Sequence, residues 1–377
     1  MVLNWTSTPG LTYWVYYKAG ASVSKDDFTA INYGVTAPAI IVGLTNNTQY
    51  SFLITASDNG SKTGPASPVL PATPRLVGPA TTWTVGAPLF PTQDMTGIAF
   101  GNNLFVAVGN VASVFAATHS YTSPGGVLID ATHTGWSPVT TLPNVITQSI
   151  NFSAVIYDGA RFVALGSDGS IITSTDTITW TVGTSIGTTG MHALVYGAGP
   201  AYVAVGNGGK IYRNTGAGIT AAWTAETSGT TQDLYGVSYV NGIYVAVGVG
   251  GTLLTSLDGG VTWKPQASNT PNNLHQVAFG AGTYVAVGDI GTIVSSTDGV
   301  IWTAQNSHPT PQGLRTICFG PDARFFAAGT AGTIVYSDTG ADGSWLPLNV
   351  GSSDLNSIVP SDVFIAVGTA GANVSGK

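Results

Sequence analysis

The feature that most limits the fold is a short motif that occurs seven times. Each copy is an aromatic residue followed by small apolar residues and a closing glycine, and a Gly-rich turn with a short β-branched segment comes next. The copies are 105–109, 162–166, 202–206, 244–248, 284–288, 325–329 and 364–368. A period of roughly 40 residues is typical of four-stranded propeller blades. The sequence therefore predicts a seven-bladed β-propeller.

The tryptophans predict how the ring closes. Each motif copy except the last is followed by a tryptophan, and Trp83 precedes the first copy. We therefore expect the strand around Trp83 to supply the missing outer strand of the final blade. Such closure hides the strand edges that an open repeat array would expose.

The composition agrees with an all-β fold and excludes several functions. Only 8% of the residues are charged, where about 25% is typical, and glutamate occurs once, at Glu226. Gly, Thr and Val abound, which favours strands over helices. The net charge of −7, with scattered basic residues, argues against nucleic acid as a partner. No apolar run is long enough for membrane insertion.

The N-terminal segment, 1–74, has a different pattern. Period-two strands are predicted at 13–17, 39–42 and 50–56, which indicates a β-sandwich. The segment 44–50 resembles the tyrosine corner of a fibronectin type III domain, and Trp5 resembles that family's strand-B tryptophan. The resemblance implies a fibronectin type III-like sandwich over 1–74. Its end, 67–74, is rich in proline, a short linker follows at 75–80, and the propeller is expected at 81–377.

One departure from that family concerns its first strand. Only four residues precede Trp5, so strand A is missing and a sheet edge is uncovered. We expect either that the chain is a fragment of a longer polypeptide or that another segment completes the sheet. Met1 does not begin a signal peptide, so an exported chain would have been processed or truncated.

Aspartate turns precede several of the tryptophans. The segment 256–263 resembles the Asp-box of bacterial neuraminidase repeats, with shortened forms at 296–302 and 174–180. We interpret these residues as structural: the carboxylate accepts backbone N–H bonds within its turn, and the tryptophan fills the space between strands. The residues concerned are Asp176, Trp180, Asp258, Trp263, Asp298 and Trp302.

The complete repeat resembles a group of bacterial and phage propellers related to the photosystem II assembly factor. The resemblance covers nearly all of 81–377 and implies a protein-binding platform or an exposed structural module. A fold does not specify a function, however. The site must be argued from its own residues.

The sequence lacks the set of residues that a sialidase site requires. A sialidase needs an arginine triad, a tyrosine nucleophile with a glutamate partner and an aspartate, and one glutamate in a loop cannot complete that set. Hydrolysis by two aspartates stays open, because paired carboxylates suffice for glycosidic cleavage. Asp94, Asp233 and Asp354 lie in loops leading to inner strands. We expect no enzyme activity, and we expect the chain to have no catalytic residues.

The residues that break the repeat give the candidate site. The position after the first apolar residue of each inner strand is occupied in turn by Thr96, Ser153, His192, Tyr235, His275, Arg315 and Asn356. His192, Tyr235, His275 and Arg315 come from four consecutive blades, so they should form one polar, aromatic arc near the channel mouth. Such a mixture suits a sugar or a peptide. The alternative is that they are only solvated rim residues.

No metal or cofactor site is expected. His119 and His133 flank Asp130, but their spacings match no metal-binding motif. No phosphate-binding loop or dinucleotide fingerprint occurs, since the many Gly-x-Gly strings belong to the repeated turns.

Three functions follow from these observations. The first is a non-catalytic interaction or structural protein of an exterior assembly, such as a phage tail or fibre component or a bacterial surface or filament-associated protein. It would be extracellular, on the cell surface or in the virion, and would bind protein partners or a cell-surface glycan. The second is a secreted carbohydrate-active enzyme resembling a glycoside hydrolase, and the third is an assembly factor for a membrane complex.

Overall fold

A computed structural model represents the chain of 377 residues. The structure describes residues 2–3, 11–20, 22–24, 26–35, 39–40, 50–57, 66–67, 69–72, 83–86, 93–118, 136–139, 142–143, 146, 150–197, 201–215, 219–307, 309–361 and 364–376. The chain divides into two compact units, Met1–Ala80 and Thr81–Lys377.

The first unit contains one four-stranded and one two-stranded antiparallel sheet. Its strands are β1 (Val2–Leu3), β2 (Thr12–Ala19), β3 (Ala30–Val35), β4 (Ala39–Ile40), β5 (Tyr50–Ser57) and β6 (Leu70–Ala72). The larger sheet has the order β3-β2-β5-β6, and β1 pairs with β4. Tyr16, Val23 and Leu53 form a buried cluster.

The fibronectin type III resemblance of this unit stays a prediction. Trp5, most of the tyrosine corner at 44–50 and the linker at 75–80 lie outside the described residues. The described strand β5 begins at Tyr50, and its side chains alternate partly between buried and half-buried. That pattern fits a strand with one face on a core.

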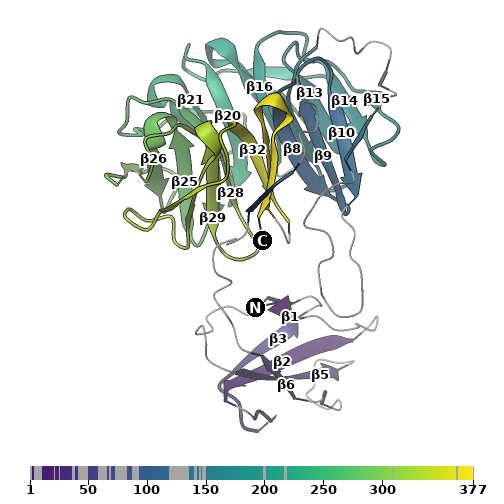
Figure 1. The fold of residues 1–377 in the computed structure, drawn as a ribbon, viewed down its shortest axis with the longest axis vertical. Helices are drawn as coiled ribbons and strands as arrows, with labels where there is room; N and C mark the ends of the chain where they lie inside the picture. The colour runs from purple at the N-terminus through teal and green to yellow at the C-terminus, as the bar shows by residue number, and fades with distance from the viewer. Residues whose placement is uncertain are drawn as a thin grey trace. The chain divides into compact units, whose positions relative to one another are not determined.

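The second unit is a seven-bladed β-propeller, as the sequence predicts (Figure 1). Each blade is a four-stranded antiparallel sheet. From the innermost strand outward, the first blade is β8–β11 (Met95–Gly101, Leu104–Gly109, Val114–Thr118, Ser137–Pro138) and the second is β12–β15 (Phe152–Tyr157, Phe162–Gly166, Ile171–Ser174, Thr181–Val182). In the same order, the third blade is β16–β19 (Met191–Gly197, Ala201–Gly206, Ile211–Asn214, Thr224–Glu226). The fourth is β20–β23 (Leu234–Val240, Ile243–Gly248, Leu253–Ser256, Lys264–Pro265). Blades five to seven are β24–β27 (Leu274–Gly280, Thr283–Gly288, Ile293–Ser296, Thr303–Ala304), β28–β31 (Leu314–Phe319, Phe325–Gly329, Thr333–Ser337, Leu346–Asn349) and β32, β33, β34 and β7 (Leu355–Pro360, Phe364–Gly368, Asn373–Gly376, Trp83–Val85).

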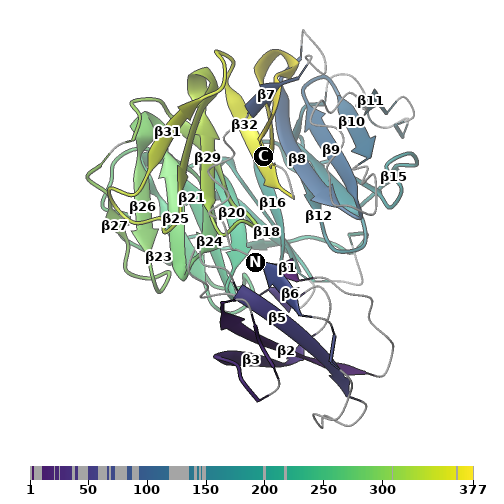
Figure 2. The same ribbon diagram turned by 60° about the horizontal axis from the view of Figure 1, so that its bottom comes forward.

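The ring closes as predicted. Strand β7 pairs with β34, so that Trp83 lies opposite Gly376 and Val85 opposite Val374. The inner strand β32 of the last blade contacts β8 of the first (Figure 1). Figure 2 shows β7 beside the yellow strands of the C-terminal blade. The N-terminal strand of the propeller thus completes the blade built by the C-terminus.

The hydrophobic core lies between neighbouring blades. The cluster between blades three and four joins Val203 and Val205 of β17 with Tyr244, Leu254 and Trp263 of the next blade. Similar clusters lie between blades two and three, between blades four and five, and between blades five and six. Each blade therefore packs its sheet face against the sheet face of the next, which is how β-sheets bury their apolar side.

The closing glycine of the repeated motif is explained by a close backbone approach. Gly248 is extended, with φ of −171°, so its backbone does not require glycine. A Cβ added there would overlap the carbonyl oxygen of Asp233, at the start of the same blade's inner strand. Gly109, Gly288 and Gly368 face the corresponding carbonyls in their own blades. The glycine lets the second strand end against the chain segment that enters the blade.

The outer strand of the fourth blade is shorter than the sequence suggests. The repeat pattern predicts an outer strand over 261–264, whereas β23 spans Lys264–Pro265. Val261 and Thr262 belong to the aspartate turn, where Asp258 accepts the backbone N–H of Thr262 at 2.9 Å. The indole N–H of Trp263 donates to the carbonyl of Gly260 at 3.0 Å, which holds the tryptophan at the end of the turn.

The related turns at Asp176 and Asp298 have the same hydrogen bonds. The Asp176 carboxylate accepts the N–H groups of Ile178 and Thr179, at 2.9 and 2.7 Å. The Asp298 carboxylate accepts those of Val300 and Ile301, both at 2.8 Å. Trp180 and Trp302 are buried and donate back to their own turns. These groups are therefore used in local structure.

Helices are almost absent from the described part of the chain. It contains five three-residue 3₁₀ turns, η1 (Asn207–Gly209), η2 (Val249–Gly251), η3 (Asp289–Gly291), η4 (Thr330–Gly332) and η5 (Thr369–Gly371). Each links the second and third strands of its blade. No helix among the described residues has the length and hydropathy of a membrane span.

Candidate binding site

A β-bulge near the start of every inner strand sets the geometry of the site. In each blade the register with the second strand skips one residue, as between Leu234, opposite Gly248, and Gly236, opposite Val247. The skipped residues are Thr96, Ser153, His192, Tyr235, His275, Arg315 and Asn356. A bulge leaves one residue unpaired and redirects its side chain. The position that varies between the sequence repeats is thus also the position that has no paired residue on the second strand.

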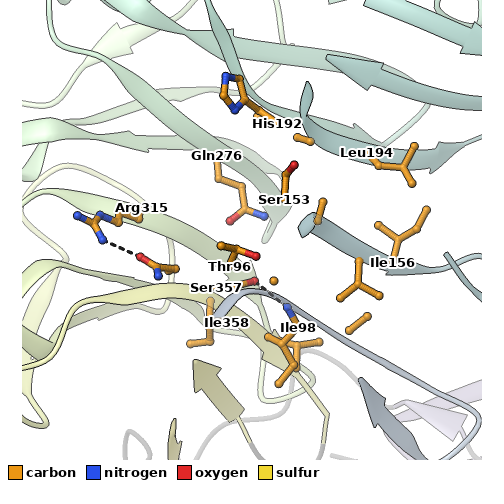
Figure 3. Close-up of a pocket in the computed structure, with 18 of the residues that line it drawn as sticks. Thr96, Ile98, Ser153, Ile156, His192, Leu194, Gln276, Arg315, Ser357 and Ile358 are labelled. Carbon is orange, nitrogen blue, oxygen red and sulfur yellow. Dashed lines mark hydrogen bonds between the residues drawn. The ribbon is translucent and has the colours of Figure 1, made fainter. Parts of the chain in front are cut away.

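These seven residues line one pocket at the centre of the ring. The cavity has a volume of about 370 Å³, and its lining also includes the apolar side chains of Ile98, Leu194 and Ile358. Figure 3 shows Thr96, Ser153, His192, Gln276 and Arg315 around the same opening, contributed by five different blades. A concave apolar pocket with a few polar groups is the usual form of a ligand site.

On one side of the mouth the polar groups bond to the next blade. The hydroxyl of Thr96 donates to the carbonyl of Phe152 at 2.6 Å. The hydroxyl of Ser153 donates to Met191 at 2.8 Å, and the amide of Asn356 donates to Met95 at 2.8 Å. We call Asn356, Thr96 and Ser153 the bonded side. Their side chains join consecutive blades.

The other four residues form the arc that the sequence predicts. Tyr235 packs edge-on against His192, with ring centroids 5.6 Å apart, and stacks on His275 at 5.3 Å. Arg315 lies in the following blade and lines the same pocket. We call His192, Tyr235, His275 and Arg315 the polar arc. Its members come from four consecutive blades.

Both histidines are held by a neighbour in their own blade. His275 Nε2 lies 2.7 Å from Asp289 Oδ1, and Asn273 donates to the other oxygen of Asp289 at 2.9 Å. His192 Nε2 lies 2.5 Å from Asn207 Oδ1. The His275 side chain is 22% exposed, so it is anchored yet accessible from the pocket.

Arg315 is fixed by two partners from the last blade. Its guanidinium donates to Asn356 Oδ1 at 2.6 Å, the bond dashed at Arg315 in Figure 3. It also forms an ion pair with Asp354 at 3.0 Å. The arginine charge is therefore balanced by a carboxylate. Because Asn356 also bonds to Met95, this contact joins the polar arc to the bonded side.

The pKa of Tyr235 is raised above its ordinary value. Burial raises the pKa of Tyr235, and the carboxylates of Asp233 and Asp289 raise it further. Both carboxylates disfavour a tyrosinate next to them. The hydroxyl therefore remains protonated at neutral pH and can both donate and accept a hydrogen bond.

The three aspartates considered for hydrolysis have a structural use that the sequence analysis missed. Asp233 accepts the backbone N–H of Gly208 at 2.7 Å, Asp354 accepts that of Ala331, and Asp94 accepts that of Ala370, both at 2.9 Å. In each case the acceptor begins one blade and the donor lies in the turn of the preceding blade. Asn151 and Asn273 make the equivalent bonds to Val111 and Gly250.

A sequence signal for this use exists. The residue before the first apolar residue of each inner strand is Asp, Asn or Gly in all seven blades, namely Asp94, Asn151, Gly190, Asp233, Asn273, Gly313 and Asp354. Asp and Asn share a side-chain oxygen at the same position, and an amide cannot act as a general acid or nucleophile. The interchange of Asp and Asn therefore indicates a hydrogen-bonding role.

The remaining candidate residues lie away from the mouth. The turns of Asp176, Asp258 and Asp298 join third and fourth strands, at the end of the blade opposite the bulge. His119, Asp130 and His133 lie outside the described residues. Within the described ranges no three His, Cys, Asp or Glu side chains are grouped so that they could hold a metal ion.

Comparison with known proteins supports the fold. The sequence matches no protein-family model, and no curated protein is significantly similar to it. The structure is similar to YCF48 bound to D1 peptide (TM-score 0.60, 21% identity, covering 78% of this chain and 96% of that one). It is also similar to YCF48 from Cyanidioschyzon merolae (TM-score 0.59, 18% identity, covering 78% and 99%). The computationally designed Ika8 protein is a third neighbour (TM-score 0.53, 12% identity, covering 78% and 99%). At these identities the likeness shows the fold alone.

Proposed function

We propose that this chain is a non-catalytic interaction protein that binds a segment of another protein through the polar arc. One observation carries the proposal. The bulge residues of the bonded side direct their polar atoms into the next blade, whereas the polar arc presents a tyrosine hydroxyl and two anchored imidazoles to a pocket. Aromatic side chains with polar tips are enriched at protein interfaces because they contribute contact area and hydrogen bonds together.

The structural neighbours favour a peptide over a glycan as the ligand. One similar propeller has been solved with a peptide bound, the YCF48 structure with D1 peptide. Its identity to this chain is 21%, so it supports the kind of ligand and not its sequence or position. A cell-surface glycan is the second ligand that the same arc would accept.

The proposed setting is an exterior assembly, either a phage tail or fibre or a bacterial surface or filament structure. The low content of charged residues, 8%, supports it, since such a surface is covered by Ser, Thr, Asn and Gly. The protein would then be extracellular, on the cell surface or in the virion. An assembly factor for a membrane complex would use the same peptide chemistry, and the partner's identity would distinguish the two.

A carbohydrate-active enzyme is the less favoured alternative. Glycosidic cleavage uses two carboxyl groups flanking the scissile bond. Asp94, Asp233 and Asp354 each bond to a backbone N–H of the preceding blade, and Asp354 also pairs with Arg315. These bonds favour a structural role for all three carboxylates.

Selection from a random peptide library tests the proposal. Wild-type protein should enrich peptides whose affinity falls at least about tenfold, or 1.4 kcal/mol, in Tyr235→Ala. Lys264→Ala is the matched control, because Lys264 is an exposed residue of an outer strand and should leave the affinity unchanged. Failure to enrich any peptide, or peptides that bind Tyr235→Ala as well as wild type, would contradict the proposal. A glycan array probed with the same proteins tests the second ligand.

A further inference from the structure

The hydrogen bonds of the two histidines fix which ring nitrogen carries the proton in the neutral ring. His275 Nε2 lies 2.7 Å from Asp289 Oδ1, and an ionised carboxylate only accepts hydrogen bonds. Nε2 therefore carries the proton in the neutral ring. Asp289 is itself held by Asn273, so the imidazole orientation has a second support.

His192 has the same arrangement with an amide in place of the carboxylate. Its Nε2 lies 2.5 Å from Asn207 Oδ1, and an amide oxygen accepts. The proton again lies on Nε2. In both neutral rings Nδ1 is left as a hydrogen-bond acceptor.

Three polar atoms of the arc consequently remain for a ligand. They are His192 Nδ1, His275 Nδ1 and the Tyr235 hydroxyl, and within the described ranges none of them has a protein hydrogen-bond partner. All three side chains line the same pocket, and Tyr235 lies between the two rings, 5.6 Å from one and 5.3 Å from the other. Two of the three atoms can only accept.

The charges around the arc favour a cation. Asp233 and Asp289 carry carboxylates close enough to Tyr235 to raise its pKa. Arg315, the arginine of the arc, is ion-paired with Asp354 at 3.0 Å. With neutral histidines, this group of side chains carries three carboxylates and one guanidinium. A negative surplus next to acceptor atoms suits a positively charged donor.

We propose that the partner segment inserts a lysine side chain whose ammonium donates to Tyr235 Oη and to Nδ1 of a histidine beside it in the arc. This inference rests on the proposed function, because it assumes that a protein segment enters the pocket. A lysine ammonium has three donors and no acceptor, which suits a group of atoms that accept. A glutamate or aspartate side chain would bring only acceptors and add to the negative charge.

The same geometry makes the interaction sensitive to acid. Protonation of His192 or His275 converts Nδ1 from acceptor to donor and places a positive charge beside the ammonium. The other charged or titratable groups around the arc are Tyr235, which stays neutral, and the Arg315–Asp354 pair with Asp233 and Asp289. Lysine binding should therefore weaken as the pH is lowered and the imidazoles take up a proton.

Nuclear magnetic resonance of the imidazole nitrogens tests the first step. Long-range ¹H–¹⁵N spectra of the full chain at neutral pH should show both rings as the Nε2–H tautomer, with His192→Gln and His275→Gln providing the assignments. Asp289→Asn should disturb the signals of His275 and leave those of His192 unchanged. A proton on Nδ1 of either neutral ring would overturn the inference.

Titration with small probes tests the second step. Nα-acetyl-lysine methylamide should shift the signals of His192, Tyr235 and His275, whereas the norleucine analogue, which lacks the ammonium, and the glutamate analogue should not. Tyr235→Phe should weaken the lysine probe by about fivefold. Ser153→Ala, on the bonded side, is the matched control and should leave its affinity unchanged.

The outcomes separate this inference from the proposed function. Equal binding of norleucine, preference for glutamate, or shifts caused only by a methyl glycoside would overturn the lysine proposal. Selected peptides that depend on Tyr235 but share no lysine would also overturn it, while the proposed function would stand. If no peptide is selected, the proposed function itself fails.

Discussion

The bonded side and the polar arc occupy the same backbone position and differ only in side chain. In all seven blades the residue lies in a β-bulge at the channel mouth. Thr96, Ser153 and Asn356 are short and place a donor within 2.8 Å of a carbonyl in the next blade. The histidines and Tyr235 extend further and, among the described residues, do not bond to a carbonyl of the next blade. Arg315 also lines the pocket, and it bonds to Asn356 and Asp354 of the next blade.

The difference shows how a repeat fold can hold structure and recognition in one ring. Each of the seven blades places one bulge residue at the mouth of the channel. Side-chain length then decides whether a position joins two blades or presents its polar atoms to a ligand. A change on the bonded side should therefore affect stability, and a change in the arc should affect binding.

The largest expected effect should be equal on the two sides, because it concerns the motif that they share. Gly109→Ala, next to the bonded side, and Gly248→Ala, next to the arc, would each place a Cβ against a backbone carbonyl. We expect each to lower the free energy of unfolding by about 3 kcal/mol, measured by chemical denaturation.

Gly250→Ala is the control for these variants. Gly250 has φ of +64° and open space around it, and Ala331 and Ala370 occupy the equivalent positions of other blades. The Gly250→Ala variant should lose about 1 kcal/mol of unfolding free energy. Wild-type stability in Gly248→Ala would show that the close approach does not explain the glycine.

The next effect should separate the two sides. Thr96→Val removes the hydroxyl that bonds to the carbonyls of Phe152 and Val108, at 2.6 and 3.2 Å, and should lower the free energy of unfolding by about 1–2 kcal/mol. Tyr235→Phe removes a hydroxyl that has no partner in the described ranges. It should change the free energy of unfolding by less than about 0.5 kcal/mol. If thermal or chemical unfolding showed the same loss of stability in both variants, the proposed difference between the bonded side and the polar arc would be wrong.

A smaller effect should appear at the bonds between blades. Asp94→Ala removes the acceptor of the Ala370 N–H and should cost about 1 kcal/mol in chemical denaturation. Asp94→Asn should be close to neutral, because Asn151 and Asn273 make the same bond in their blades. If Asp94→Asn keeps its fold but loses hydrolysis of a glycan substrate, the aspartate is catalytic and the structural account is wrong.

The smallest effect should come from the aspartate turns, which occur on both sides of the ring. Hydrogen bonds from Thr262 lower the pKa of Asp258 from 3.8 to about 2, so the folded state favours the ionised form. This stabilisation is present above about pH 4 and is lost as the pH falls toward 2. The melting temperature of wild type should fall more steeply through that window than that of Asp258→Asn. Parallel curves would contradict the assignment.

Most of the propeller could be predicted from the sequence because its signals are local and repeated. Seven motif copies gave the blade number, and the position of Trp83 before the first copy predicted the closure that β7 makes. The outer strand of the fourth blade is predicted at 261–264, but Val261 and Thr262 belong to the aspartate turn, in which the Thr262 N–H bonds to Asp258. The fibronectin type III resemblance depends on residues outside the described ranges.

The arc could be located from the sequence, but its chemistry could not. Aligning the repeats identified His192, Tyr235, His275 and Arg315 as members of consecutive blades. The bulge that releases them is a two-to-one register with the second strand, which no alternation pattern records. The bonds of Asp94, Asp233 and Asp354 cross from one blade to the next, so they require the packed ring.

The central claim is that one position serves stability on the bonded side and binding in the arc. Measuring both the free energy of unfolding and the affinity for a selected peptide, in Ser153→Ala and His275→Ala, tests it most directly. We predict that Ser153→Ala loses about 1 kcal/mol of stability and keeps its affinity. His275→Ala should keep its stability within about 1 kcal/mol and bind at least about tenfold more weakly. Loss of affinity in both variants, or loss of stability alone in both, would contradict the claim.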